Sequence, residues 1–211
     1  MIAEGRIGVQ LGSDGVVQPA RIGRTGEIIV GSAHGDFYEA VARQSVFTFS
    51  NAVAGVAPGT VLSTTPPLAL WNPPGSGVNL ALVKATMSYV SGTMGAGSIV
   101  FALVAQQATQ PSGGTQLTGQ SNLIGSTKTP IGKGFTGSTL ASTPLILRPW
   151  GSFGPYLATS VLSERTFETI NDGAMVVTPG GVLCVQGVAT AGTTPLVIFA
   201  MVFEEVPIIG S

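Results

Sequence analysis

The chain has 211 residues, of which 44% are hydrophobic and only 9% are charged, and its formal net charge at pH 7 is −1. The hydrophobic content excludes a disordered chain, because disorder requires low hydrophobicity and high charge. The balanced charge excludes the strongly basic surface that binds nucleic acid or an anionic membrane, so we expect neither partner. No uninterrupted apolar run reaches the length of about 18 residues that a membrane-spanning helix needs.

Charged side chains are concentrated at the start of the sequence. Residues 1–43 hold nine of the nineteen charged side chains, and residues 44–211 share the other ten. We therefore predict a polar N-terminal arm over 1–43 and a dense domain over 44–211. Short apolar pieces separated by turn residues, such as the Gly-Ser-Asp-Gly run at 12–15, predict short β-hairpins in the arm. Such hairpins are too small to form their own core, so we expect the arm to pack on something else.

Most of the domain has the periodicity of strands. The segment from Ser45 to Ser50 alternates apolar and polar side chains, as a half-buried strand does. A nine-residue piece from Asp36 to Gln44 is the best candidate for a helix. The segments 80–90 and 98–105 are separated by a Gly-rich loop, and this spacing predicts a hairpin. The strands predicted from composition and turn residues are at 45–50, 80–90, 98–105, 140–147, 165–170, 174–177, 182–188 and 196–203.

Eight short strands with Gly and Pro between them predict an all-β fold. The expected architecture is a jelly-roll-like β-sandwich with an extended N-terminal arm. Residues 106–138 form a long stretch rich in Gly, Ser, Thr and Gln. Loops of that length are uncommon unless they are functional or disordered. We expect this segment to be either an exposed binding loop or a loop ordered by a neighbouring chain.

Residue patterns that carry catalysis or bind metal are nearly absent from the sequence. The run from Gly132 to Gly137 matches G-x-G-x-x-G, but it lacks the strand and helix that a dinucleotide site needs. His34 is the only histidine and Cys184 the only cysteine, which is too few for a usual zinc site. Glu204 and Glu205 are adjacent near the end of a strand and point to opposite faces. We predict a non-enzymatic protein without metal or cofactor, in which Cys184 is a buried structural thiol.

Three aromatic side chains are candidates for ligand stacking. Trp71 and Trp150 each lie beside proline in a predicted loop, and Tyr156 follows the second tryptophan. In one interpretation these rings stack on a sugar or a receptor, which would make the domain a binding module. In the other, the rings cap the end of the sandwich or contact another subunit.

The composition of the domain favours assembly. With ten charged side chains in 168 residues, its surface consists mainly of Gly, Ser, Thr, Gln, Ala and Pro. Such a surface lacks the charge that usually keeps monomers apart. We therefore expect much of it to be covered by copies of the chain or by a larger assembly.

Two stretches resemble parts of known virion proteins. The run Arg21-Ile22-Gly23-Arg24-Thr25-Gly26-Glu27-Ile28-Ile29-Val30-Gly31 resembles the leader of many tailed-bacteriophage virion proteins. The run Thr178-Pro179-Gly180-Gly181-Val182-Leu183, continuing through Phe199 to Glu205, is similar to the closing strands of trimeric jelly-roll virion domains. Among such proteins, capsid decoration (cement) proteins form trimers on the shell, and an extended arm holds neighbouring capsomers.

This resemblance implies a bacteriophage cement protein that is made in the host cytoplasm and located in the virion. Its expected partners are two further copies of itself, in a homotrimer, and the major capsid protein or other virion proteins. The candidate assembly contacts are Arg21, Arg24, Glu27, His34 and Asp36. The alternative is a tail, neck or head-fibre module of the same fold that binds a receptor or carbohydrate through Trp71, Trp150, Tyr156 or the 106–138 segment.

Overall fold

The structure is a computed structural model that describes residues 35–153, 166–190 and 192–208. The chain divides into two compact units, Met1–Glu39 and Ala40–Ser211. The predicted hairpins of the arm lie outside the described residues, and the predicted domain boundary after residue 43 stays a prediction.

The predicted helix is present but shorter than expected. Helix α1 spans Tyr38–Ala42 rather than Asp36 to Gln44. It ends early because Gln44 has a φ of 58°, in the left-handed region that commonly follows a helix. There the backbone N–H groups of Gln44 and Ser45 donate to the carbonyl oxygens of Val41 and Ala40.

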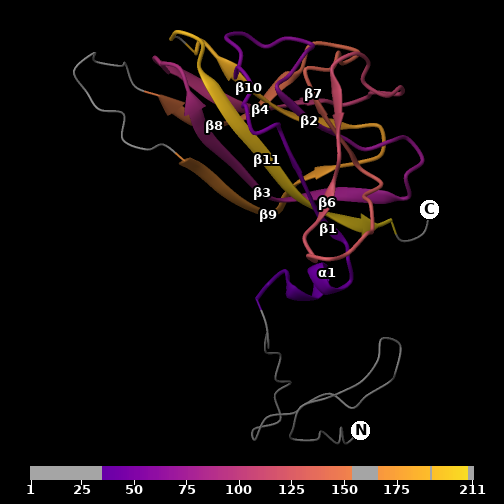
Figure 1. The fold of residues 1–211 in the computed structure, drawn as a ribbon. Helices are drawn as coiled ribbons and strands as arrows, with labels where there is room; N and C mark the ends of the chain where they lie inside the picture. Colours follow the sequence, from indigo (N-terminus) through magenta and orange to yellow (C-terminus); the bar gives the residue numbers. More distant parts are fainter. Residues whose placement is uncertain (1–34, 154–165, 191, 209–211) are drawn as a thin grey trace, which may run out of the picture. The chain divides into compact units, whose positions relative to one another are not determined.

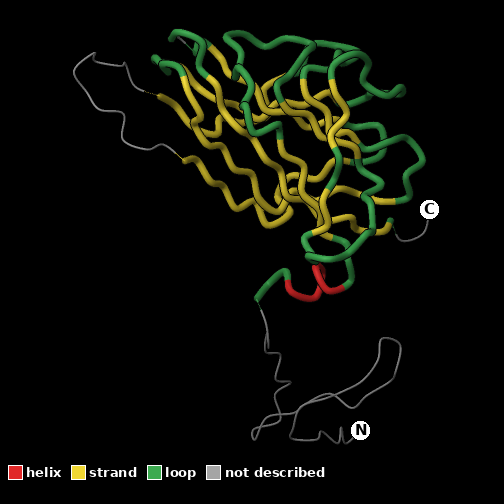
Figure 2. The backbone as a smooth tube through the Cα atoms, viewed as in Figure 1, coloured by secondary structure: helices red, strands yellow, loops and turns green. Residues whose placement is uncertain are grey.

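Eleven strands of the described chain form two antiparallel sheets (Figures 1 and 2). The five-stranded sheet has the order β6-β1-β11-β3-β9, and the six-stranded sheet has the order β5-β7-β2-β10-β4-β8. The longer strands are β1 (Val46–Ser50), β2 (Leu68–Trp71), β3 (Val78–Ser91), β4 (Gly97–Val104), β8 (Leu145–Phe153), β9 (Thr166–Val177), β10 (Val182–Val188) and β11 (Leu196–Pro207). The short ones are β5 (Thr115–Leu117), β6 (Gln120–Ser121) and β7 (Lys133–Thr136).

The eight longer strands pair as nested antiparallel couples. The first pairs with the last, β1 with β11, and the next couples inward are β2 with β10, β3 with β9 and β4 with β8. The same pairing results when one long hairpin is rolled into two facing sheets, and this arrangement is a jelly roll. The predicted all-β, jelly-roll-like sandwich is therefore confirmed.

The predicted hairpin between 80–90 and 98–105 is wrong. These segments are β3 and β4, which lie in different sheets. Strand β3 is paired along both of its edges, with β11 and with β9, so it has no edge left for β4. Local turn chemistry suggested the hairpin, but pairing between distant strands decided the topology.

The core lies between the sheets and follows the alternation of the strands. Along β11 the buried side chains are Val197, Phe199, Met201 and Phe203, with half-buried ones between them. Phe203 stacks on Phe49 of β1 with 5.4 Å between ring centroids. Strand β10 is buried on both faces, because a second apolar cluster covers the outer side of the six-stranded sheet.

Cys184 belongs to that second cluster and is fully buried, as predicted. Burial raises the pKa of its thiol to about 12, so the side chain is protonated and unreactive at neutral pH.

The 106–138 segment is not one continuous loop, because it contains three short strands, although many of its residues are exposed. Its predicted role as a binding loop or as a loop ordered by a neighbouring chain stays a prediction. The segment contains β5 and β7, which extend the six-stranded sheet beyond β2, and β6, which extends the other sheet beyond β1. Two glycines permit its close packing, since a Cβ at Gly134 would lie 2.4 Å from Phe49 and one at Gly119 would lie 2.3 Å from Pro130. The segment therefore covers the β1 and β2 edges of its own chain.

Two further strand predictions change in the structure. The predicted strands 165–170 and 174–177 are one strand, β9, which is interrupted by a bulge where Asp172 and Gly173 have positive φ. Strand β8 begins at Leu145 rather than at residue 140, because Leu140 is held away from it by a backbone hydrogen bond to Thr64. The four-residue strand β2 was not predicted, since prolines flank a run too short to show periodicity.

Replacing Gly134 by Ala tests how tightly the 106–138 segment packs. The added Cβ must displace the ring of Phe49, so we expect the free energy of unfolding to fall by about 1–3 kcal/mol. Urea denaturation measures the change, with Gly35→Ala as control because nothing lies within 4 Å of its added Cβ. Equal stability of the two variants would contradict the packing.

Candidate functional site: the open side of the sandwich

The two sides of the sandwich are protected differently. On one side the β1 and β2 edges are covered by the short strands β5, β6 and β7. On the other side the edge strands are β8 and β9, which are nine and twelve residues long. We call the region formed by β8 and β9 the open side, because neither strand pairs with a further strand in the described chain.

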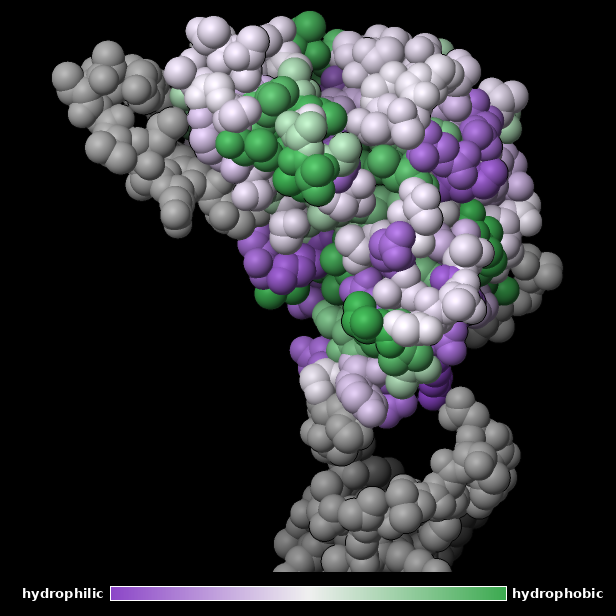
Figure 3. Space-filling model, viewed as in Figure 1, coloured by the Kyte–Doolittle hydropathy of each residue, from purple (hydrophilic) through white to green (hydrophobic). Residues whose placement is uncertain are grey.

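The open side exposes large aliphatic side chains. In β8, Leu145, Ile146 and Leu147 are 70%, 53% and 44% exposed, and in β9 Ile170 and Val176 are 64% and 51% exposed. Single exposed aliphatic residues are common, but a group of them on neighbouring elements marks an interaction surface. In the view of Figure 3 strongly hydrophilic residues cover only separate patches of the described surface.

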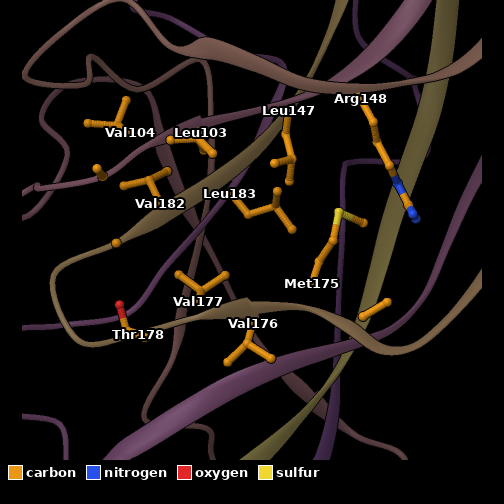
Figure 4. A pocket seen from close by; sticks show the side chains of 13 residues that line it. Leu103, Val104, Leu147, Arg148, Met175, Val176, Val177, Thr178, Val182 and Leu183 are labelled. Carbon is orange, nitrogen blue, oxygen red and sulfur yellow. The ribbon is translucent and has the colours of Figure 1, made fainter.

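A cavity of about 500 Å³ opens between the sheets at this side. Leu103, Leu147, Leu183, Met175 and Val177 surround it, and Arg148 lies at one margin (Figure 4). Most of its lining residues come from β4 and β8 of one sheet's open edge, from β9 of the other sheet and from β10. Most of the residues that line it have apolar side chains, and Arg148 is the one charged residue among them.

Arg148 joins the two sheets across the open side. Its guanidinium donates a hydrogen bond to the amide oxygen of Asn171, which lies at the β9 bulge and is buried. The same guanidinium lies 5.6 Å from the ring centroid of Phe101 on β4, a cation–π contact. The guanidinium of Arg148 is therefore held between a neutral amide and an aromatic ring of the same chain.

Trp150 is positioned by the same strand and packs inward. Its ring stacks on Phe101 with 5.0 Å between centroids and also contacts Phe199 of the other sheet at 6.1 Å. The indole Nε1 is buried without a hydrogen-bond partner in the described chain. The residue was predicted in a loop, but it lies in β8, where a bulge allows its side chain to enter the core.

Trp71 also lies in a strand rather than in the predicted loop. It is only 5% exposed in β2, and its indole N–H donates to the carbonyl oxygen of Gln107 at 3.0 Å. Lys133 approaches its ring, with 5.7 Å from Nζ to the centroid. This geometry does not favour stacking of a ligand on Trp71, and a stacking role for Trp71, Trp150 or Tyr156 stays a prediction.

Most predicted assembly contacts cannot be placed. Arg21, Arg24, Glu27 and His34 lie outside the described residues, as does Tyr156. Asp36 is described and exposed. The role of these residues as assembly contacts therefore stays a prediction.

Glu205 holds a loop that the sequence analysis had considered only as a nucleotide motif. Its carboxylate is 6% exposed and accepts backbone hydrogen bonds from Ile131 at 2.5 Å and Gly132 at 2.9 Å. Burial raises its pKa, an effect opposed by these two donors and by Lys128. Glu204 is half-buried and Glu205 buried, as expected for opposite faces of a strand. The sequence next to Glu205 did not indicate that its carboxylate would accept hydrogen bonds from the backbone of a distant loop.

The described chain shows neither a metal centre nor a nucleotide loop. No three His, Cys, Asp or Glu residues within 35–153, 166–190 and 192–208 are grouped as metal ligands would be. The residues Lys133 to Thr136 of the G-x-G-x-x-G match form β7 instead of opening a helix. None of the described helices is long and apolar enough to cross a membrane.

The fold defines the chain as an all-β jelly-roll sandwich with one open side. Comparison of the chain with protein-family models, with curated proteins and with solved structures finds no match.

A double-mutant cycle tests the link between the sheets. We expect Arg148→Ala and Asn171→Ala to destabilise the protein non-additively, with a coupling of about 1.5 kcal/mol, because the hydrogen bond is charged and Asn171 is buried. The control is the more exposed Lys84–Glu168 ion pair, whose coupling we expect below about 1 kcal/mol. Additive effects of Arg148 and Asn171 in urea denaturation would refute the link.

The raised pKa of Glu205 predicts a specific pH dependence. The folded state holds this proton more tightly than the unfolded state, whose pKa is near the ordinary 4.5. The stabilising contribution is therefore complete below pH 4.5 and is lost as the pH rises through the folded pKa. We expect wild type to gain stability relative to Glu205→Gln when the pH falls from 7 to 4 in urea denaturation. A constant difference would show that Glu205 does not titrate abnormally.

Proposed function

We propose that the chain is a non-enzymatic structural protein of a bacteriophage virion that decorates and stabilises the capsid. In this proposal it is a homotrimer, anchored to the shell by its N-terminal arm. The observation that carries the proposal is that the chain is a jelly roll with very few charged residues, and that its open side exposes aliphatic side chains. Such a surface favours burial against another protein.

The fold alone does not select this function, because jelly rolls occur in viral capsid proteins, in lectins and in cupins. The placement of the side chains favours assembly over sugar binding. The two described tryptophans pack inside the chain, while the exposed large side chains are mainly aliphatic. Sugar sites typically present exposed aromatic faces, and aliphatic surfaces are covered by protein.

The proposed roles of the domain and of the arm follow the distribution of charged residues between them. The nearly uncharged domain provides contacts between subunits, which are stabilised by burial of apolar area. The arm carries nine of the nineteen charges, so it suits polar contacts with the capsid protein. Arg21, Arg24, Glu27, His34 and Asp36 are the proposed contacts of the arm with the shell.

Deletion of residues 1–40 tests this division. We expect the truncated protein to keep the trimer mass of about 64 kDa, three times the 21.3 kDa of one chain, in light scattering. We also expect it to lose binding to undecorated capsids in a sedimentation assay, because the anchor is absent. A truncated protein that still decorates capsids would refute the anchoring role, and a monomeric full-length protein would refute the trimer.

A further inference from the structure

The open side is large enough to be a subunit interface. Nine residues of β8 extend about 30 Å, and two sheets about 10 Å apart with their side chains are about 20 Å thick. The side therefore presents about 600 Å² per subunit, which is near the area of about 800 Å² per partner in specific interfaces. The cavity mouth and the exposed aliphatic side chains of β8 and β9 lie within this area.

The charges of the open side permit a neutral partner. The ionisable residues of β8 and β9 are Arg148, Glu168 and Asp172. Arg148 is bonded to Asn171, and Glu168 forms an ion pair with Lys84 at 2.6 Å. Glu168 is thus paired within the chain, Arg148 is held by a neutral amide, and Asp172 is exposed. The cation of Arg148 and the anion of Asp172 balance in net charge, so a weakly charged protein meets little net repulsion here. A second copy of this chain, with a net charge of −1, has that property.

The edges themselves are protected against simple strand addition. Pro149 in β8 has no N–H to donate, and register shifts leave Leu147 and Trp150 as bulged residues. Strand β9 has its own bulge at Asp172 and Gly173. Bulges and proline interrupt the flat template that leads to open-ended aggregation. These strands are therefore better suited to contact through side chains than through strand addition.

We propose that the open side packs against a second copy of this chain. Leu145, Ile146, Leu147, Ile170 and Val176 become buried in the contact, and the neighbouring subunit covers the mouth of the cavity. In a closed trimer the contact is heterologous, so the open side of one subunit meets a different surface of the next. This inference rests on the proposed assembly function and identifies the surface that carries it.

Charge substitutions at the open side test the inference. In Leu145→Lys on β8 and Val176→Lys on β9, an ammonium group must be buried without a partner, so we expect the oligomer to dissociate at least tenfold more readily on dilution. The matched control is Thr115→Lys, which adds the same charge to the exposed edge strand β5 at the opposite end of the same sheet. Light scattering over a dilution series measures dissociation, and circular dichroism confirms that each variant is folded.

The outcomes separate this inference from the proposed function. Dissociation of both open-side variants, with an unchanged control, supports the contact. An unchanged mass of Leu145→Lys and Val176→Lys overturns it and leaves the proposed function standing, as does equal dissociation of the control. A monomeric wild type also overturns it, and capsid sedimentation of the same sample then decides the decoration function independently. Because the substituted side chains are already exposed, the two variants are not expected to unfold.

Discussion

The nested antiparallel pairing of the eight longer strands is the constraint on which the rest of the structure depends. The strands of the inner pairs are hydrogen-bonded to partners that are distant in the sequence. Consecutive strands such as β3 and β4 therefore lie in different sheets. This pairing brings Phe49, Phe199 and Phe203 into one layer between the sheets. It also leaves each sheet with two edges whose backbone groups need pairing, cover or water.

The two sides of the sandwich differ in how their edge strands are covered. The 106–138 segment supplies three short strands that finish the β1 and β2 side, and Glu205 fixes part of it through two backbone hydrogen bonds. At the β8 and β9 side, side chains of the described residues connect the sheets, through Arg148 to Asn171 and through Trp150 in the core. Aliphatic side chains of β8 and β9 are exposed at that side, and the proposed contact between subunits would bury them.

A low surface charge is compatible with solubility when apolar edges are interrupted. Proline and bulges in β8, and the bulge in β9, prevent continuous strand pairing while the aliphatic side chains remain available. Of the charged side chains on these strands, Glu168 pairs with Lys84 and Arg148 donates to the neutral amide of Asn171. The proposed contact and the interruption of strand pairing therefore involve the same two strands, β8 and β9.

The sequence by itself determined the all-β class, most strand positions, the buried Cys184 and the opposite faces of Glu204 and Glu205, because these depend on local periodicity and composition. Only the tertiary structure decided that 80–90 and 98–105 belong to different sheets and that 106–138 covers an edge. It also decided that Trp71 and Trp150 pack inward, and that Glu205 and Arg148 hold distant segments. These features depend on which distant strands pair, and local pattern carries no information about such pairing.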